Sequence, residues 1–364
     1  MAIGNKPDVI VVGAGIFGLA CAYACAKRRL KVLVIDAEDL GTGASGGIVG
    51  AMAPHTPDQW NPKKQFQFEA LDSAENFWRE VDSQSGHSSG YGRVGRVIPI
   101  VSEKDLILAE ARIEASRENW LEAYRWKIID DAPHVSKSAA PFGLIEETLS
   151  ARIYPRRAVR SLAAACAKLG VVFQMHTRVT AIDDHMVTTT SGEQKAAAVI
   201  LAAGYHGFHL MDFHLGAGSG TGVKGQAARL DVDLGGHPQI YADNIYVIPH
   251  ADGTTAIGST SENSWGQPFE TDEQLDRIID QACNICPSLA GAEVIERWAG
   301  LRPKARRRDP MIGSMPGLSG MYVATGAFKI GFGIAHKVGD VVAAEILGEH
   351  PVIPDSFTVS HHLA

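Results

Sequence analysis

Three glycines and one aspartate near the start of the chain have the types and spacing that bind a dinucleotide. Gly13, Gly15 and Gly18 form a GxGxxG sequence, and Asp36 follows further along. In such a sequence the first glycine makes a tight turn, the second lets the backbone approach a pyrophosphate, and the third lets a helix pack closely on a strand. The Asp36 carboxylate is suited to accept hydrogen bonds from the hydroxyl groups of an adenosine ribose. We therefore expect these residues to hold the adenosine and pyrophosphate of a dinucleotide cofactor.

The elements that must position these residues can be read from the surrounding sequence. Residues 9–12 are β-branched, which predicts a buried parallel strand, and a helix rich in small residues is predicted after the glycines. A second strand is predicted over residues 31–35, ending next to Asp36. The helix would present the free N–H groups of its first turn and the positive end of its dipole to the phosphates. This order of elements favours a ligand-binding turn over a glycine-rich turn without a ligand.

Other glycine-rich stretches also indicate turns that face a ligand. The loop at 40–54 is rich in Gly, Ala and Ser, which suits a backbone lying against a flat ligand, and its aliphatic residues are too apolar for a disordered linker. An apolar strand predicted over 196–202 runs into Ala203 and Gly204, as strands do where a doubly wound sheet approaches its ligand. A further strand, glycine turn and helix are predicted between residues 321 and 347, so the chain closes as it begins.

Size, composition and charge exclude several classes of function. The 364 residues allow two domains, and 45% hydrophobic with 21% charged residues is ordinary for a soluble globular protein. A net charge of -7 argues against nucleic-acid binding as the main purpose. The uncharged run at 9–26 is explained by the strand and buried helix, so we expect no integral membrane segment and a cytoplasmic protein. Neither the five cysteines nor His206, His209 and His214 have the spacing of a metal site, so no metal is expected.

Several motifs in order resemble the flavin-dependent D-amino-acid oxidase superfamily, and within it the glycine oxidase and sarcosine oxidase branch. They span nearly the whole chain except 83–142, where no motif matches. The motifs are the N-terminal fingerprint, the loop at 42–51, and residues 199–204, 223–226, 245–249, 298–303, 310–313 and 326–333. The resemblance implies an α/β fold, with a Rossmann-like, discontinuous FAD-binding domain and an antiparallel-sheet α+β substrate-binding domain. We expect the first domain at 1–82, 143–215 and 296–364, and the second at 83–142 and 216–295.

The resemblance implies that FAD lies extended along the first domain. Its flavin ring would lie between the loop at 44–50 and the turn at 329–333, and Val179 would contact the adenine side. The helix after Gly333 would direct its N-terminus at the flavin and stabilise the anionic reduced form. No Cys or His stands where covalent-flavin members of the family have one, so FAD is expected to be non-covalent. The residues expected to bind FAD are Gly13, Gly15, Ile16, Phe17, Gly18, Asp36, Ala37, Thr42, Gly43, Ala44, Ser45, Gly46, Gly47, Gly50, Val179, Ala203, Gly204, Gly326, Lys329, Ile330, Gly331, Phe332 and Gly333.

On the substrate side, the resemblance implies that Arg302 and Tyr246 bind a carboxylate. Arginine can grip a carboxylate with two parallel N–H···O bonds, and a phenol can add a third. The alternatives are a structural arginine and a tyrosine that only packs. Lys329 departs from the arginine expected in glycine oxidases and resembles the sarcosine oxidase pattern; it would add positive charge near the carboxylate or cap its turn. These three are the candidate catalytic residues, and Ile48 and Ala51 would line the substrate pocket.

The expected reaction is the FAD-dependent oxidation of the C–N bond of an amino acid or N-substituted glycine. A hydride would leave the α-carbon, and water would hydrolyse the resulting imine to a 2-oxo acid and an amine or ammonia. The electron acceptor would be O2 or a quinone-type compound, and the sequence does not separate the two. A homo-oligomer is compatible with the sequence.

Two other classes of function stay open. One is an FAD enzyme that modifies an aminomethyl group of tRNA, which the net acidity and the lack of a basic tract beyond 306–308 disfavour. The other is an NAD-dependent dehydrogenase, because Asp36 suits NAD equally well. The second glycine turn near the C-terminus favours FAD.

Overall fold

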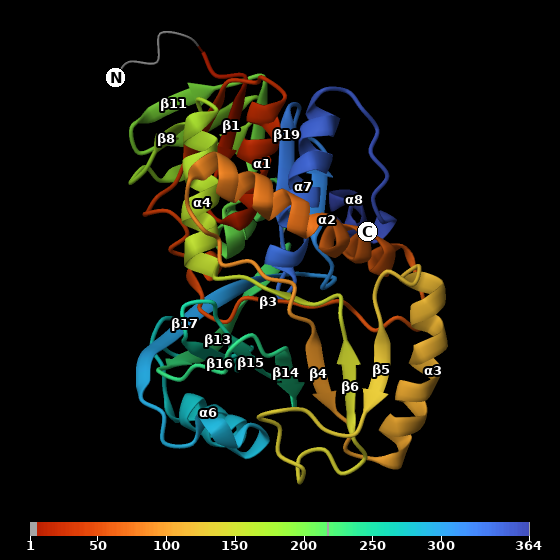
Figure 1. Ribbon diagram of the computed structural model, residues 1–364. Coiled ribbons are helices and arrows are strands. Elements are labelled where there is room, and N and C mark those ends of the chain that lie inside the picture. Colours follow the sequence, from red (N-terminus) through yellow and green to blue (C-terminus); the bar gives the residue numbers. More distant parts are fainter. Residues whose placement is uncertain (1–5, 217, 364) are drawn as a thin grey trace.

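A six-stranded sheet forms the upper half of the molecule in Figure 1, a computed structural model that describes residues 6–216 and 218–363. The strand order is β18-β19-β12-β1-β2-β8, and all neighbours are parallel except β18 and β19. The chain moves from β1 to β2 on one side and later adds β12 on the other, and ligands bind at the carboxyl ends of strands at such a point. The strands are β1 (Val9–Val12), β2 (Val32–Ile35), β8 (Val172–Gln174), β12 (Ala198–Leu201), β18 (Met311–Ser314) and β19 (Met321–Thr325).

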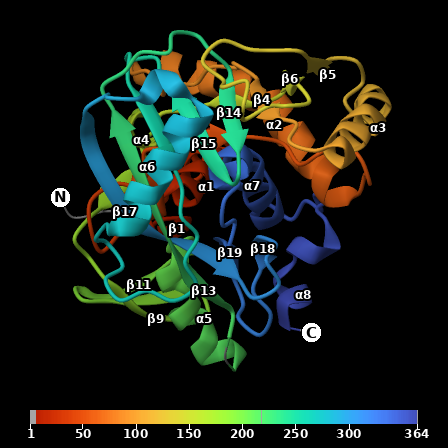
Figure 2. The same cartoon turned by 90° about the horizontal axis from the view of Figure 1, so that it is seen from below.

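Helices cover one face of this sheet and a small three-stranded sheet covers the other (Figures 1 and 2). Alternate residues of β1 define the two layers, because Val9 and Val11 pack among the helices, whereas Ile10 and Val12 pack toward the small sheet and α5. The helices on the first face are α1 (Ile16–Lys27), α2 (Pro62–Ser85), α4 (Pro155–Lys168) and α7 (Gly331–Ile346). The second face carries β9 (Val179–Asp183), β10 (Met186–Thr189), β11 (Gly192–Lys195) and α5 (Gly207–Leu215).

Glycines allow α1 to pack closely on its neighbours. A Cβ on Gly18 of α1 would lie 1.9 Å from the carbonyl oxygen of Gly13, and a Cβ on Gly339 of α7 would lie 2.5 Å from that of Ala20. Side chains at these two positions would force the elements apart. As a result α1 and α7 lie side by side, and both begin at the carboxyl ends of parallel strands.

An eight-stranded sheet forms the lower half, in the order β17-β13-β16-β15-β14-β4-β6-β5 (Figure 1). Its neighbours are antiparallel except for β14 and β4. The helix α6 (Glu273–Ile285) packs on its central strands, and α3 (Glu103–Asn119) packs beside β5. The strands are β4 (Arg96–Pro99), β5 (Trp126–Ile129), β6 (Leu144–Glu147), β13 (Gly220–Leu230), β14 (Gln239–Ala242), β15 (Ile245–Pro249), β16 (Thr255–Gly258) and β17 (Val294–Ala305). The short pair β3 (Ala51–Met52) and β7 (Ala151–Arg152) and the helix α8 (Val359–Leu363) complete the strands and α-helices of the described residues.

The expected α/β fold with two sheet-based parts is confirmed, but two of the expected domain limits differ from the strand pairing. β6 pairs with β4 and β5, so residues 144–147 lie in the eight-stranded sheet and not with the segment 143–215. β17 pairs with β13 along its length, so the limit at 296 falls inside one strand. The physical reason is that each pairing is fixed by partners far away in sequence, which a single sequence does not display.

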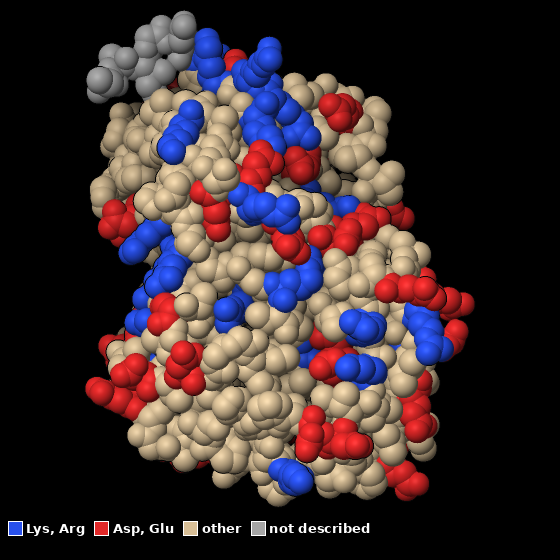
Figure 3. Space-filling view, in the orientation of Figure 1, with Lys and Arg blue, Asp and Glu red and all other residues tan. Residues whose placement is uncertain are grey.

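Two features of the described residues concern binding to membranes and to nucleic acids: the length and apolarity of the helices, and the distribution of surface charge. None of the helices in the described ranges has both the length and the apolarity that crossing a bilayer requires. On the face shown in Figure 3, acidic and basic residues are interspersed. That face therefore presents a mixed charge pattern and no continuous basic tract.

Candidate active site

A cavity of about 1180 Å³ lies where the loops of the six-stranded sheet face the eight-stranded sheet. Its lining includes Asp36 and Val179 beside the parallel strands, and Arg302 and Lys329 beside β17 and α7. All the residues expected to contact the cofactor or the substrate line this one cavity, except Gly18 and Gly46. A large concave site with a few convergent polar groups is the usual location of a ligand.

The two exceptions shape the turns behind the cavity wall, which differs from the expectation that they contact the cofactor. Gly18 is required by the packing of α1 described above. A Cβ on Gly46 would lie 2.6 Å from the carbonyl oxygen of Gly41, and Arg156 of α4 donates a 2.8 Å hydrogen bond to the Gly46 carbonyl. These contacts fix the backbone of the loop whose other residues face the cavity.

The first turn of α1 is open to the cavity. Its N-cap is Gly15, which has no side chain to cap the helix, and the first turn contains no acidic residue. The Ile16 N–H donates to Ser45 Oγ at 2.9 Å. A Cβ on Gly15 would meet only that Ser45 oxygen, at 3.2 Å, so packing within the protein does not by itself demand glycine here. An open helix N-terminus with free space above Gly15 fits the pyrophosphate of FAD.

The carboxylate of Asp36 is held at the carboxyl end of β2. Its Oδ2 accepts a 2.6 Å hydrogen bond from the Ala14 N–H, and its Oδ1 accepts a 2.9 Å bond from the Glu38 N–H. Each carboxylate oxygen has a further lone pair for another donor. The geometry therefore fits a ribose hydroxyl as an additional donor.

A second open helix N-terminus lies at the start of α7. Its N-cap, Ile330, provides no side-chain hydrogen bond, and no acidic residue lies in the first turn. The Phe328 N–H donates to the Pro303 carbonyl at 2.9 Å, which ties this turn to β17 beside Arg302. Burial and the positive charge of Arg302 lower the pKa of Lys329. The turn thus brings two cationic side chains together next to a positive helix end.

Arg302 is directed into the cavity by its neighbours in the eight-stranded sheet. Its Nη2 donates to Ser259 Oγ at 2.6 Å and its Nη1 donates to the Thr260 carbonyl at 3.1 Å. The guanidinium lies across Gly225 of β13, where a Cβ would come within 1.8 Å of Nη2. This explains the glycine of the 223–226 motif, because any side chain there would displace the guanidinium.

The charge of Arg302 has no carboxylate of its own. Glu262 is the acidic residue that affects it, but this carboxylate is bound by Thr260 Oγ1 at 2.5 Å and Gln226 Nε2 at 3.0 Å, and Lys224 lies 3.7 Å away. Burial lowers the pKa of Arg302 to about 10, with Glu262 acting in the opposite direction. Within the described residues, no ion pair joins Arg302 or Lys329 to an acidic side chain. A half-buried cation with no ion-pair partner among the described residues is suited to bind an anionic ligand group.

Several cavity-lining residues were missed by the sequence reasoning. Arg96, Tyr241, Asn244 and Trp298 line the cavity beside Tyr246 and Arg302. Arg96 lies in the region 83–142, which matches no family motif, and a lone arginine in a short strand gives no signal of burial. Trp298 opens the 298–303 motif, which could have directed attention to it.

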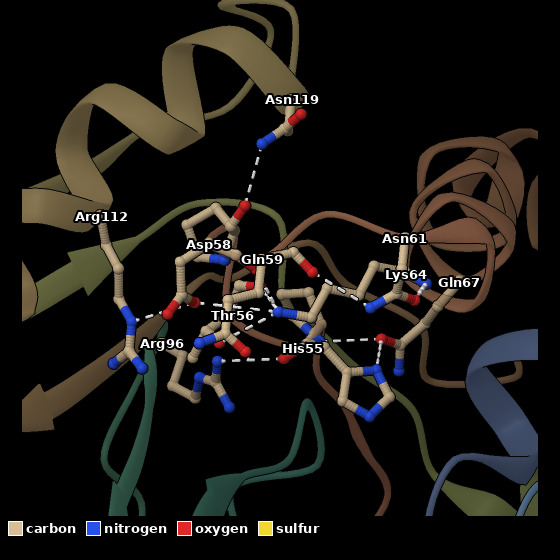
Figure 4. A network of polar contacts seen from close by, with 12 residues as sticks. His55, Thr56, Asp58, Gln59, Asn61, Lys64, Gln67, Arg96, Arg112 and Asn119 are labelled. Carbon is tan, nitrogen blue, oxygen red and sulfur yellow. Dashed lines mark hydrogen bonds and ion pairs between the residues drawn. The ribbon is translucent and has the colours of Figure 1, made fainter.

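Residues 54–61, between β3 and α2, form a segment that we call the 54–61 strap (Figure 4), and its first residues, 54–56, line the cavity. Lys64 Nζ donates to the Thr56 carbonyl at 2.7 Å and to the Asp58 carbonyl, and Arg112 Nε lies 3.2 Å from Asp58 Oδ1. Asn119 Nδ2 donates to the Pro57 carbonyl at 3.0 Å. The strap is therefore anchored from both α2 and α3.

No group of three or more His, Cys, Asp or Glu side chains within residues 6–216 and 218–363 is placed to hold a metal. Cys21, Cys25, Cys166 and Cys286 are buried, and all five thiols are free.

The six-stranded, largely parallel sheet, the two open helix N-termini and the large cavity fit the binding of a dinucleotide cofactor. The chain belongs to the DAO family of FAD-dependent oxidoreductases, whose family model matches residues 8–345. It is therefore an FAD-dependent amine or amino-acid oxidoreductase, and the expected resemblance and cofactor are confirmed.

Individual relatives are glycine oxidases. The chain is 25% identical to glycine oxidase from Bacillus licheniformis over 94% of each chain, and 27% identical to glycine oxidase from Pseudomonas aeruginosa over 95% of this chain and 96% of that one. The structure of glycine oxidase from Geobacillus kaustophilus superimposes with a TM-score of 0.88, at 22% identity, over 97% of this chain and 98% of that one. Iminodiacetate oxidase from Chelativorans sp. BNC1 gives a TM-score of 0.83, at 22% identity, over 96% of this chain and 98% of that one. These two structural likenesses show the fold alone.

Proposed function

We propose that the protein oxidises the C–N bond of a small amino acid or N-substituted glycine, of the glycine, sarcosine or D-amino-acid type. The product would be an imine, which water hydrolyses to a 2-oxo acid and an amine or ammonia. The electron acceptor would be O2 or another oxidant such as a quinone.

The observation that carries this proposal is the cation pair in the cavity wall. Half-buried Arg302 and the more exposed Lys329 both line the cavity, and neither forms an ion pair with a carboxylate of the described residues. Tyr246 lines the same cavity. A substrate carboxylate would neutralise this charge and accept two parallel hydrogen bonds from the guanidinium. The three residues therefore select an amine that also bears a carboxylate.

The roles of the chain's own groups follow from this placement. Bound FAD supplies the two-electron acceptor that takes a hydride from the α-carbon. Arg302, with Lys329 and Tyr246, would hold the carboxylate and so fix the α-carbon in one position, which reduces the entropic part of the barrier. Ile48, fully buried at 0% exposure, and Ala51 would keep that part of the cavity apolar. Water would then enter only to hydrolyse the imine.

The printed names of relatives support the same substrate class. Glycine and iminodiacetate are small amines that carry a carboxylate on the carbon next to nitrogen. We also propose that the six-stranded sheet with its helices is the FAD-binding domain and that the eight-stranded sheet carries the substrate residues.

The test is a substrate screen with the purified holoprotein. Glycine, sarcosine, proline and D-amino acids are compared with amines that lack a carboxylate, using peroxide formation under O2 and, separately, reduction of a dye acceptor. We expect kcat/KM to be far higher for amines that carry the α-carboxylate than for the matched amines that lack it. Equal turnover of the matched amines without a carboxylate would refute the proposal.

A further inference from the structure

A buried ion pair lies behind the part of the cavity wall that contains Tyr246. Arg96 of β4 and Glu147 of β6 are cross-strand neighbours, and Arg96 Nε lies 3.0 Å from Glu147 Oε1. Arg96 is 5% exposed and Glu147 is 0% exposed. An ion pair this deeply buried is weak evidence for a role in stability, because removing two charges from water offsets their attraction. We therefore consider whether the pair serves to position the Arg96 guanidinium at the cavity wall.

Glu147 is fixed by the turn that follows its own strand. Its Oε2 accepts hydrogen bonds from the N–H groups of Leu149, at 2.9 Å, and Ser150, at 3.0 Å. Its Oε1 accepts a bond from the Ser150 hydroxyl. Backbone donors therefore hold the carboxylate in one place, and it serves as a rigid counter-ion for Arg96.

The other end of the Arg96 guanidinium points at two parts of the cavity wall. Its Nη1 donates to the Tyr246 hydroxyl oxygen at 3.3 Å, and its Nη2 donates to the Pro54 carbonyl at 3.4 Å, at the start of the 54–61 strap (Figure 4). The ring of Tyr241 lies over the guanidinium, 5.6 Å away, and 4.5 Å from the ring of Tyr246. Arg96 thus connects the strap, Tyr241 and Tyr246.

The direction of the bond to Tyr246 has a chemical consequence. Arginine has only donors, so the Tyr246 oxygen must be the acceptor. The hydroxyl hydrogen of Tyr246 is then free to point elsewhere, and Tyr246 lines the cavity. A phenol held in this way keeps its hydroxyl hydrogen for a ligand oxygen.

We propose that Arg96, held by Glu147, is a positioning residue that orients the Tyr246 hydroxyl as a donor to the substrate carboxylate. This inference rests on the proposed function, in which Tyr246 contacts that carboxylate. Arg96 itself acts through Tyr246.

The test is a double-mutant cycle on the holoenzyme with Arg96→Lys and Tyr246→Phe. Lysine keeps a positive charge beside Glu147, but its single ammonium lacks the fork that reaches both Glu147 and the phenol. Each single variant is expected to raise KM for the α-amino carboxylate roughly 10-fold with a smaller change in kcat, because one hydrogen bond to a charged group is lost. The double variant should be no worse than Tyr246→Phe alone.

A matched control is Arg93→Lys. Arg93 also donates to backbone carbonyls, at Leu149 and Leu71, but it does not line the cavity. Its KM should stay at the wild-type value, and all variants should keep their FAD.

Two outcomes would overturn the inference in distinguishable ways. If the effects of Arg96→Lys and Tyr246→Phe multiply, Arg96 does not act through the phenol, and only the inference fails. If Tyr246→Phe leaves KM unchanged, the proposed substrate role of Tyr246 fails and the inference with it. Should Arg96→Lys not fold, Glu147→Gln takes its place in the cycle, with a smaller KM increase expected that disappears in the Tyr246→Phe background.

Discussion

At the scale of single residues, the cavity concentrates positive charge where a substrate would lie. The Arg302 guanidinium donates hydrogen bonds to Ser259 and Thr260. Glu262 is the acidic residue that affects its pKa, but this carboxylate accepts hydrogen bonds from Gln226 and Thr260. The guanidinium is therefore positioned but not neutralised. The positive charge of Arg302 is therefore available to form an ion pair with the carboxylate of an incoming substrate.

The charge of this pair predicts a pH dependence of carboxylate binding. The pKa of Lys329 is lowered by burial and by Arg302, and burial lowers that of Arg302 to about 10. Only the protonated forms attract a carboxylate, so affinity is lost as pH rises through the lowered pKa values. Glycolate is a suitable competitive inhibitor, because it has no amine to titrate. Its inhibition constant should rise by up to about tenfold per pH unit once the first cation titrates.

Lys329→Met serves as the comparison for this profile. It should weaken glycolate binding and leave only the rise in the inhibition constant that belongs to Arg302. An inhibition constant that stays flat up to pH 10 in the wild-type protein would show that neither cation binds the carboxylate.

Single residues differ in how far the sequence alone could place them. Arg302 and Tyr246 lie in motifs, and the structure places both on the cavity as expected. Arg96 could not be found this way, because its importance comes from Glu147 and Tyr246, which only the folded sheet brings beside it. Residues that act through another side chain carry no local pattern.

At the scale of elements, the N-termini of α1 and α7 border the same cavity. Both helices follow strands of one parallel sheet, so both dipoles direct positive ends toward the bound group. One end fits a pyrophosphate, and the other lies beside the cation pair. The glycines between strand and helix decide how closely a ligand can approach.

Gly15→Val tests the role of the first turn. The backbone of Gly15 is extended, and a Cβ there would meet only Ser45 Oγ, at 3.2 Å, so we expect the variant to fold. The side chain would occupy the space above the α1 N-terminus, and FAD affinity should fall at least tenfold, since losing one charge-assisted hydrogen bond has about that effect. Flavin absorbance per protein after gel filtration measures the loss.

Gly266→Val is the control for this substitution. No atom lies within 4 Å of a Cβ at Gly266, and this residue does not line the cavity, so flavin content should be unchanged. A folded Gly15→Val protein with full flavin occupancy would mean that the pyrophosphate lies elsewhere.

Strands were harder to anticipate than these helices. The strand–turn–helix units at both ends of the chain follow from local sequence, with glycines and apolar runs in register. The pairing of β6 with β4, and the full length of β17 against β13, depend on partners far along the chain. The expected limits near 143 and 296 therefore do not coincide with the edges of the two sheets.

At the scale of the whole molecule, each of the two sheets contributes a different set of residues to the cavity. Loops from the six-stranded sheet face the expected position of FAD, and strands of the eight-stranded sheet present Arg302, Tyr246 and Arg96. The cavity between them is continuous. In the proposed function, substrate and cofactor would therefore meet at the junction of the two parts.

Whether FAD is covalently attached depends on which side chains of the cavity lining could form a bond to the flavin. Among its described lining residues there is no cysteine, and the histidines are His55, His206 and His209. We predict that FAD is held without a covalent bond, so acid precipitation should release all the flavin into the supernatant. Yellow colour that stays with the washed pellet would show a covalent link.

The central claim is that Arg302 anchors the carboxylate of the substrate, and Arg302→Ala tests it most directly. Removing one partner of a desolvated guanidinium–carboxylate pair is worth on the order of 2–5 kcal/mol. The value of kcat/KM for an α-amino carboxylate should therefore fall by roughly 30-fold to several thousand-fold, with Arg302→Lys recovering only part. Flavin content should stay at the wild-type value, and an amine without a carboxylate should lose far less. Equal losses for amines with and without the carboxylate, or loss of the flavin, would contradict the account.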